Sequence, residues 1–292
     1  MTAEPPDADL PGADLPAAGL PGADLLSAAM QEYYELGKET DRLALTGQGR
    51  LEFERTQEIV LRHLPPRPAT IADIGGGPGR YSLWLAGLGY RVLHRDLVPL
   101  HVQQLRAAVE GGSDIHTAVA DARSLDLADE SVDAVLLLGP LYHLTQPADR
   151  VQALREAHRI VRVGGPVFGA AISRWAARLE AMLRLRIYRE VPEAAAVIDP
   201  VERTGVLPPL VPGGFNGYTH RPDELRAEFA AAGLQVSDLV AVEGAAYLLA
   251  DLDDRTADER DWQVVLETAR AHEHVPELLG LGSHLLATGL KP

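Results

Sequence analysis

The sequence predicts an α/β fold, in which a mostly parallel β-sheet is covered on both faces by helices. Between about residues 68 and 173, short apolar runs alternate with helical segments. A glycine-rich turn, DIGGGPG at 73–79, joins the first of these runs directly to a helix, and the alternation resumes after residue 221. Strands that alternate with helices in this way form βαβ units, so we expect parallel strands that are buried on both faces.

Two segments precede the sheet region. Residues 1–26 repeat the phrases ADLPGADLP and AGLPGADLL, carry five acids with no Lys or Arg, and are expected to form a disordered acidic tail rather than a signal peptide. Residues 27–64 contain two helical patterns, 27–45 and 49–64, which we expect to form an N-terminal helical cover. The apolar side of the second pattern is formed by Leu51, Ile59, Val60 and Leu64.

The elements of the sheet region follow from residue spacing. An apolar run bounded by turn residues predicts a strand, whereas apolar residues three and four apart predict a helix. Pro222 suits the first turn of a helix and Gly233 its end. We expect strands at 69–74, 90–96, 115–120, 132–138, 166–172 and 235–243, a last strand within 283–292, and helices at 80–89, 99–110, 147–162 and 222–233.

Residues 174–219 interrupt this alternation. They contain an arginine-rich amphipathic helix, RWAARLEAMLRLRIYRE, followed by a loop rich in Pro and Gly. Insertions of this length in a compact domain often form lids, so we expect a lid over the ligand site. Residues 65–292 are accordingly expected to form one domain that carries this lid insertion.

The composition excludes several classes of function. The formal net charge is −15, from 27 Lys and Arg against 42 Asp and Glu, and only five of the acids lie in residues 1–26. An acidic surface repels phosphates, so nucleic acid is not expected as a partner. The chain has no Cys, which excludes disulfides, thiolate nucleophiles and Cys-bound metals. The absence of Cys also fits a reducing cytoplasm, which is where we expect the protein. No apolar run reaches the roughly 20 residues of a membrane helix, so we do not expect it to bind membranes.

The glycine-rich turn indicates a nucleotide-like ligand. Glycines let the backbone approach a ligand closely, and the helix that follows presents free N–H groups. A dinucleotide fingerprint would need glycine in place of Arg80, and the G-K-[ST] of a P-loop is absent. The pattern D-x-G-x-G-x-G at 73–79 instead resembles motif I of the class I S-adenosylmethionine (SAM)-dependent methyltransferases.

Further features agree with this resemblance, which covers about residues 50–292. Asp96 closes the second strand, where the family places an acid on the ribose hydroxyls, and Asp121-Ala122 follows the third, where the family contacts the adenine. The segments DAVLLLGPLYHL and VRVGGPVFGAAIS match the family's fourth strand and its turn into the fifth. The resemblance implies a Rossmann-like seven-stranded, mostly parallel sheet in the order 3-2-1-4-5-7-6, with N-terminal helices and SAM over the carboxyl ends of strands 1 and 4.

The resemblance assigns eleven residues to the SAM site. Simpler interpretations exist for three of them, because Asp73 could orient the glycine loop, Asp96 could be a solvated strand-end acid and Asp121 a turn residue. Arg80 is expected at the surface rather than as a partner of the SAM carboxylate. The eleven residues are Asp73, Gly75, Gly76, Gly77, Gly79, Asp96, Leu97, Asp121, Ala122, Leu138 and Gly139.

One departure from the family concerns His94 and Arg95, which precede Asp96 where the family usually has apolar residues. Either the strand is exposed near its end, or these side chains reach the rim of the cofactor. We expect exposure.

The chemistry requires few catalytic residues. Methyl transfer from a sulfonium is an in-line displacement, so the enzyme mainly positions the acceptor. A general base is needed only for a protonated acceptor such as a hydroxyl or a carbon acid. The catalytic candidates are His143 and Tyr142, which follow the fourth strand, and His220. His143 could accept a proton, form a wall of the pocket or have a purely structural role.

Aromatic residues from three places are candidates for binding the acceptor. Tyr33 and Tyr34 lie in the N-terminal cover. Tyr218 and His220 end the insertion and would face the mouth of the substrate site if the insertion is a lid. Together with Tyr142 they form the predicted substrate-binding set. Ordinary helix packing is the competing explanation for Tyr33 and Tyr34.

We therefore expect a SAM-dependent methyltransferase that acts on an O, N or C atom of a small molecule, of the kind that modifies bacterial secondary metabolites, and releases S-adenosylhomocysteine. Two alternatives stay open: a methyltransferase of peptides or proteins, and a protein of the same fold that catalyses a non-methylating reaction or only binds. No metal is expected, because His272 and His274 lie two apart on a helix and diverge. A homodimer is compatible with the sequence.

Overall fold

The structure, a computed structural model, describes residues 46–109, 113–209 and 215–292. The predicted acidic tail and the first helical pattern of the N-terminal cover lie outside the described residues, and so do Tyr33 and Tyr34.

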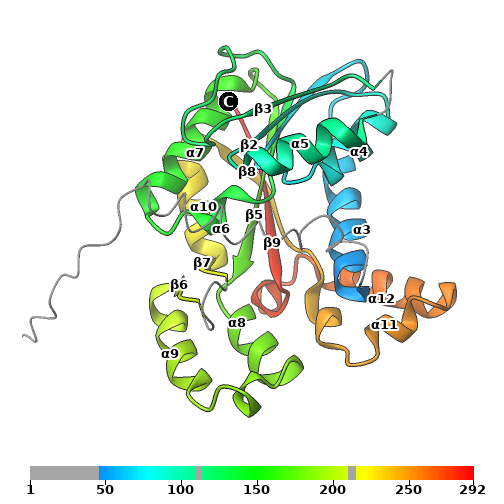
Figure 1. Cartoon of the computed structure of the whole chain (residues 1–292), viewed down its shortest axis with the longest axis vertical. Helices are drawn as coiled ribbons and strands as arrows, with labels where there is room; N and C mark the ends of the chain where they lie inside the picture. Colours follow the sequence, from blue (N-terminus) through cyan, green and yellow to red (C-terminus); the bar gives the residue numbers. More distant parts are fainter. Residues whose placement is uncertain (1–45, 110–112, 210–214) are drawn as a thin grey trace, which may run out of the picture.

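Seven strands form a continuous sheet through the centre of the molecule (Figure 1). Their order is β3–β2–β1–β4–β5–β9–β8. Neighbours from β3 to β5 are parallel, whereas β9 is antiparallel to both β5 and β8. Numbered along the chain, these strands have the predicted order 3-2-1-4-5-7-6. They are β1 (Thr70–Ile74), β2 (Arg91–Asp96), β3 (Ile115–Val119), β4 (Ala134–Leu137), β5 (Pro166–Ser173), β8 (Gln235–Ala241) and β9 (His284–Leu290).

Helices cover both faces of this sheet. One face is covered by α3 (Gly47–Leu61) and α4 (Arg80–Gly87), and the other by α7 (Pro147–Ile160) and α10 (Pro222–Ala231). The helix α5 (Pro99–Ala108) packs beside β2 and β3. These helices lie where the sequence predicts them, with ends that differ by a few residues.

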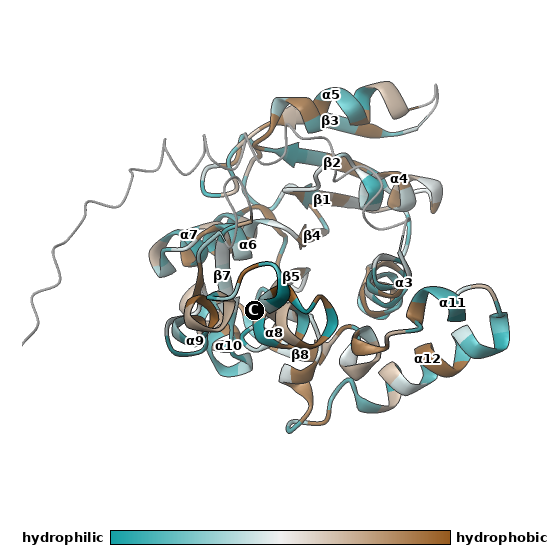
Figure 2. Ribbon diagram, turned by 60° about the horizontal axis from the view of Figure 1, so that its bottom comes forward, coloured by the Kyte–Doolittle hydropathy of each residue, from teal (hydrophilic) through white to brown (hydrophobic). Residues whose placement is uncertain are grey.

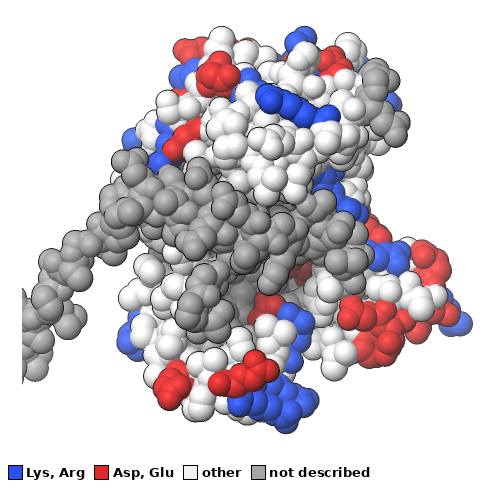
Figure 3. Space-filling model, viewed as in Figure 1, with Lys and Arg blue, Asp and Glu red and all other residues white. Residues whose placement is uncertain are grey.

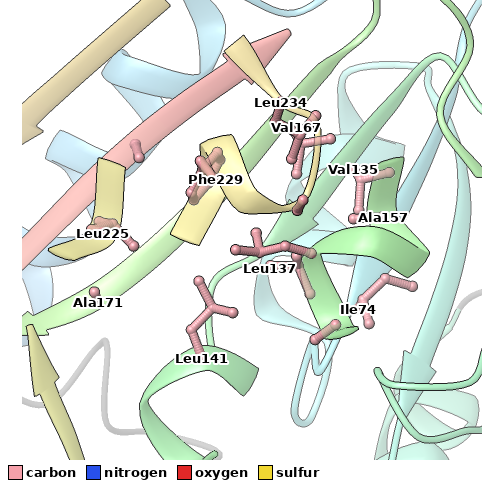
Figure 4. Close-up of a cluster of buried hydrophobic side chains, with 14 of the residues drawn as sticks. Ile74, Val135, Leu137, Leu141, Ala157, Val167, Ala171, Leu225, Phe229 and Leu234 are labelled. Carbon is pink, nitrogen blue, oxygen red and sulfur yellow. The ribbon is translucent and has the colours of Figure 1, made fainter. Parts of the chain in front are cut away.

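The strand β4 shows why two hydrophobic layers form. Successive residues of a strand point to opposite faces, so Ala134 and Leu136 pack toward α3 and α4. Val135 and Leu137 pack toward α7 and α10, in the cluster drawn in Figure 4. All four side chains are fully buried. The near-continuous apolar run of this strand is therefore the expected signature of a strand buried on both faces.

Two helices that the sequence analysis did not assign, α11 (Leu252–Arg255) and α12 (Glu259–His272), pack beside α3 (Figures 1 and 2). Trp262 is fully buried in this contact, and its indole N–H donates a hydrogen bond to Glu54 with an N–O distance of 2.8 Å. These contacts hold the first turns of α3 against the C-terminal part of the chain.

The insertion lies beyond the carboxyl end of β5 (Figure 1). It is not the single long helix that the sequence predicts, because Arg186 has a φ of 52° and interrupts regular helical structure. Two short strands add to the sheet here: β7 pairs in parallel with the last residues of β5, and β6 pairs antiparallel with β7. The elements are α8 (Ala176–Arg178), the π-helical turn η1 (Leu179–Arg184), the 3-10 turn η2 (Ile187–Arg189), α9 (Ala194–Thr204), β6 (Val206–Leu207) and β7 (Gly217–His220).

The expectation that His94 and Arg95 are exposed is wrong. His94 is 0% and Arg95 8% exposed. The imidazole of His94 bridges Thr117 Oγ1 at 2.8 Å and the carbonyl oxygen of Gly77 at 3.0 Å. The guanidinium of Arg95 donates to both carboxylate oxygens of Asp126, at 2.6 and 3.1 Å. Burial is tolerated because these polar groups have hydrogen-bond partners.

The surface in Figure 3 carries acidic side chains gathered over α11 and α12. Several acids of these two helices and their flanks, such as Asp254 and Glu259, are exposed. Within the described ranges, no helix is long and apolar enough to cross a membrane.

Candidate functional site

A cavity lies at the carboxyl ends of β1, β2 and β4, where the loops after these strands meet. An open α/β sheet binds its ligands at such a place. Gly79, which directly precedes α4, is not part of the lining, because it packs against the side chain of Leu105 on α5. The other ten residues predicted to contact the cofactor line the cavity: Asp73, Gly75, Gly76, Gly77, Asp96, Leu97, Asp121, Ala122, Leu138 and Gly139.

The glycine loop needs glycine for two different physical reasons. Gly75 and Gly77 have φ values of 66° and 57°, in the left-handed region that side chains disfavour. A Cβ on Gly75 would also lie 2.5 Å from the ring of Pro140, so the loop after β1 and the loop after β4 pack directly together. A Cβ on Gly77 would meet no atom within 4 Å. The loop is therefore held against Pro140 at Gly75, whereas the space beside Gly77 is open to the cavity.

Asp96 organises the far side of the same loop. One carboxylate oxygen accepts the backbone N–H of Gly77 at 2.8 Å, and the other accepts the N–H of Val98 at 2.8 Å and lies 3.0 Å from a ring nitrogen of His101. Burial by itself would raise the pKa of Asp96, but these hydrogen bonds and the charge of His101 outweigh burial and lower the pKa. A buried, ionised carboxylate therefore stands at the edge of the cavity.

Asp73 lies beneath the loop, fully buried at the end of β1. Its carboxylate accepts a hydrogen bond from the hydroxyl of Ser82 at 2.6 Å. Burial raises the pKa of Asp73, although His94 and Ser82 oppose this effect. A Cβ on Gly76 would collide with both Asp73 and His94, so this glycine allows the loop to rest on the two side chains.

Asp121 is held by its neighbour Arg123. The guanidinium of Arg123 donates to both carboxylate oxygens, with a shortest distance of 2.6 Å, and also pairs with Asp149 at 3.2 Å. Burial opposes ionisation of Asp121, but the hydrogen bonds from Arg123 lower its pKa. The carboxylate is therefore ionised and fixed in place beside Ala122 at the cavity wall.

Tyr142 and His143 lie on the short helix α6 (Pro140–His143) directly after β4, and both line the cavity. Phe215 packs against the two rings, with centroid distances of 6.2 Å to Tyr142 and 5.4 Å to His143. Burial lowers the pKa of His143 to about 4, with Asp96 opposing the shift. The imidazole is therefore neutral near pH 7 and a weak base.

A second cavity adjoins this aromatic group. Phe215 lines it, together with residues from the first turns of α3, from the end of β5 and from the start of β9. Because Phe215 also contacts Tyr142 and His143, this one side chain stands between the two cavities.

Tyr218 and His220 line neither of these two cavities. His220 is completely buried, and its Nε2 lies 3.1 Å from Glu228 on α10. The ring of Tyr218 is covered by the guanidinium of Arg150 at 3.6 Å, and Arg150 in turn pairs with Glu228 at 2.7 Å. The two residues thus anchor β7 to α10 and do not lie at the mouth of the cavity, where the sequence analysis expected them.

Arg80, Tyr81 and His101 line the first cavity, although the sequence analysis expected Arg80 at the surface and did not single out the other two. The guanidinium of Arg80 lies over the ring of Phe53 at 4.7 Å, and its buried Nε has no hydrogen-bond partner among the described residues. The available signals were positional: Arg80 opens the helix after the glycine loop, and His101 lies in the first turns of the helix after Asp96.

Residues 72–169 match the family model described as a methyltransferase domain. A ubiquinone biosynthesis O-methyltransferase from Xanthomonas axonopodis pv. citri is 29% identical over 62% of this chain and 69% of that one. A malonyl-[acyl-carrier protein] O-methyltransferase from Methylococcus capsulatus is 35% identical over 36% of this chain, which spans only 38% of that relative. Among solved structures, the 1,6-didemethyltoxoflavin-N1-methyltransferase of Burkholderia thailandensis, with bound 1,6-didemethyltoxoflavin and S-adenosylhomocysteine, has a TM-score of 0.56. It is 17% identical, and the match covers 94% of this chain and 92% of that one.

Proposed function

Since the chain belongs to the class I SAM-dependent methyltransferases, we propose that it transfers the methyl group of SAM to an oxygen, nitrogen or carbon atom of a small molecule, with release of S-adenosylhomocysteine. The observation that carries the proposal is the convergence of the glycine loop, Asp96 and Asp121 on one cavity at the carboxyl ends of β1, β2 and β4.

Asp96 would accept the ribose hydroxyls of SAM. The oxygen that receives the Gly77 N–H has capacity for another donor, since each carboxylate oxygen offers two lone pairs. The lowered pKa of Asp96 keeps this acceptor ionised. Asp121 and the backbone of Ala122 lie further along the wall, where the adenine would bind.

The glycine loop and Arg80 would hold the methionine part. The open space at Gly77 lets this part of the ligand approach the backbone. Arg80 presents a guanidinium at the start of α4, and its Nε–H, which has no partner in the part of the chain that the structure describes, suits the SAM carboxylate.

The acceptor would approach along Tyr142, His143 and Phe215. A displacement at the methyl carbon needs the acceptor held in line and close, and a rigid aromatic wall supplies that positioning. The neutral imidazole of His143, with a pKa of about 4, suits a pocket wall better than a general base. The relatives named above are described as O-methyltransferases and an N1-methyltransferase. These descriptions support an oxygen or nitrogen acceptor here. The substrate class that we propose is a bacterial secondary metabolite.

Calorimetric titration of the full chain with SAM, and separately with NAD, tests the cofactor. We expect SAM to bind and NAD not to bind. Asp96→Asn should weaken SAM binding at least tenfold, whereas Asp114→Asn, an exposed acid before β3 at the opposite end of the strands, should leave it unchanged. Binding of NAD without SAM would overturn the proposal.

The acceptor class is tested by incubating the protein and SAM with small phenols, carboxylic acids and amines, and by measuring S-adenosylhomocysteine together with the mass of each product. We expect a product that has gained one methyl group. Conversion of a compound without S-adenosylhomocysteine release would instead favour a non-methylating reaction.

A further inference from the structure

The second cavity, of about 360 Å³, brings together three chemically active side chains from distant parts of the chain. Glu52 comes from α3, Glu243 follows β8, and His284 is the first residue of β9. One ligand atom from each, a carboxylate oxygen or an imidazole nitrogen, lies within 4.8 Å of the other two. All three residues line the cavity.

Glu243 and His284 form a preorganised pair. The backbone N–H of His284 donates to one oxygen of Glu243 at 2.9 Å, and the imidazole Nδ1 lies 2.5 Å from the other oxygen. Glu243 is 2% exposed, so its carboxylate cannot turn to bulk water. The pair is therefore rigid before any ligand arrives.

The donor set suits a divalent cation. Glu52 and Glu243 offer carboxylate oxygens and His284 an imidazole nitrogen within a few ångströms of one another, and mixed oxygen and nitrogen ligands are those that divalent transition metals accept. Glu243 is buried, whereas Glu52 is half-buried on the side of the cavity formed by α3.

Tyr247 provides an independent sign that the cavity takes a ligand. The residue is 2% exposed and lines the same cavity, and its hydroxyl has no hydrogen-bond partner in the described part of the chain. Burial raises the pKa of this hydroxyl, and Glu180 and Glu243 add to the shift, so the group is a protonated donor close to the acidic wall. Buried polar groups normally have a partner, and a bound ligand would supply one.

We propose that Glu52, Glu243 and His284 bind one divalent cation, Zn²⁺ or Mn²⁺, in this second cavity. Carboxylates suit hard cations and imidazole suits borderline ones, and a set of both without thiolate fits these two metals best. Three protein ligands leave coordination positions open, as in metal sites that also bind a substrate.

The open side of the site gives the cation a role toward the acceptor, and this step rests on the proposed function. Phe215 lines the metal-side cavity and packs against Tyr142 and His143 of the SAM-side cavity. An acceptor held at the cation through a hydroxyl or carboxylate oxygen would therefore extend toward the cofactor past Phe215. A bound cation also makes a hydroxyl more acidic, which would meet the need for a base that His143 does not meet.

The test is metal binding by the full chain without SAM. After dialysis against a chelator, calorimetric titration with Zn²⁺ and with Mn²⁺ should give one equivalent of at least one metal, with Mg²⁺ at least tenfold weaker. Glu243→Gln and His284→Ala should each weaken binding at least tenfold. Gln48→Ala is the control, because it removes a polar side chain of the same cavity outside the trio without changing the charge of the cavity, and it should change affinity less than twofold.

Two further measurements keep the outcome unambiguous. SAM titration of every variant should give wild-type affinity, which shows that the variant is folded; Glu52→Gln, on an accessible helix face, replaces any variant that fails this check. Substitution with Co²⁺ should give a visible absorption spectrum that is lost in His284→Ala. Absence of stoichiometric metal binding, or binding that survives both Glu243→Gln and His284→Ala, would overturn the metal site, and neither result would affect SAM binding.

Discussion

The imidazole of His94, on β2, lies with its Nε2 3.0 Å from the carbonyl oxygen of Gly77 in the glycine loop. A carbonyl only accepts, so Nε2 carries the proton and donates, while Nδ1 meets the Thr117 hydroxyl at 2.8 Å. The strand β2 therefore supports the glycine loop through two side chains, those of His94 and Asp96.

Replacement of His94 by Leu should loosen this loop. We expect SAM affinity to fall about tenfold and the free energy of unfolding to fall by about 1–3 kcal/mol, since the half-buried carbonyl of Gly77 and hydroxyl of Thr117 lose their partner. Calorimetry and denaturant unfolding measure the two effects. His94→Gln, which can still donate to Gly77, should recover part of the affinity; equal loss in both variants would contradict the role of this hydrogen bond.

Replacement of Arg80 by Met tests its proposed contact with the SAM carboxylate. We expect SAM affinity to fall at least tenfold, because the charge-assisted hydrogen bond is lost while most of the apolar stem is kept. Methylthioadenosine lacks the carboxylate, so its affinity should change less than twofold. Arg155→Met, at an exposed position on α7, is the control for charge; a similar loss for both ligands would exclude this role for Arg80.

The half-buried imidazole of His143 should make stability depend on pH. Its pKa of about 4 lies below the ordinary 6.5, so the unfolded chain binds more protons between these values and stability rises with pH across that window. Above pH 6.5 the imidazole is neutral in both states and costs no stability; as the pH falls toward 4, the unfolded chain takes up the proton first and the folded state loses stability. We expect a loss of about 2 kcal/mol over this range, after allowance for partial solvent access.

Urea unfolding at a series of pH values measures this effect. His143→Gln should flatten the curve between pH 4 and 6.5, whereas His116→Gln, at an exposed position on β3, should leave its slope unchanged. An unchanged slope in His143→Gln would show that this residue titrates normally.

Replacement of Glu228 by Leu should destabilise the fold and spare the cofactor site. Glu228 pairs with Arg150 at 2.7 Å and with His220 at 3.1 Å, and the Arg150 side chain is 1% exposed. Removing one partner of a buried ion pair costs about 3–5 kcal/mol. Thermal unfolding should show this loss, and Glu267→Leu on the exposed face of α12 should shift stability by less than about 0.5 kcal/mol.

SAM affinity of the folded Glu228→Leu protein should remain within threefold of wild type. A selective loss of SAM binding at unchanged stability would contradict a purely structural role for the cluster of Glu228, Tyr218 and His220.

The SAM-side cavity was predictable because its residues follow strand ends in a recognisable local pattern. Asp96 ends a strand, and Gly75, Gly77 and Asp121 lie in the loops that follow strands; the carboxyl ends of parallel strands meet at one edge of the sheet. His94 and Arg95 were misjudged because their burial depends on Thr117, Gly77 and Asp126, which approach from other elements.

His220 is a second residue whose surroundings could not be predicted from the local sequence. Its position at the end of the insertion suggested the mouth of the cavity, but the pairing of β7 with β5 puts it against Glu228 of α10. Local sequence carries no information about which neighbour a strand end will meet.

The sequence by itself determined the alternation of strands and helices, the order of the sheet through its family resemblance, and the carboxylates around the glycine loop, because each depends on residues adjacent in the chain. Only the tertiary structure decided that Glu52, Glu243 and His284 share a cavity and that Phe215 stands between this cavity and the SAM side. The three side chains belong to a helix near residue 50 and to two C-terminal segments. Their meeting depends on how α3 packs against the sheet and against α11 and α12, which no local spacing encodes.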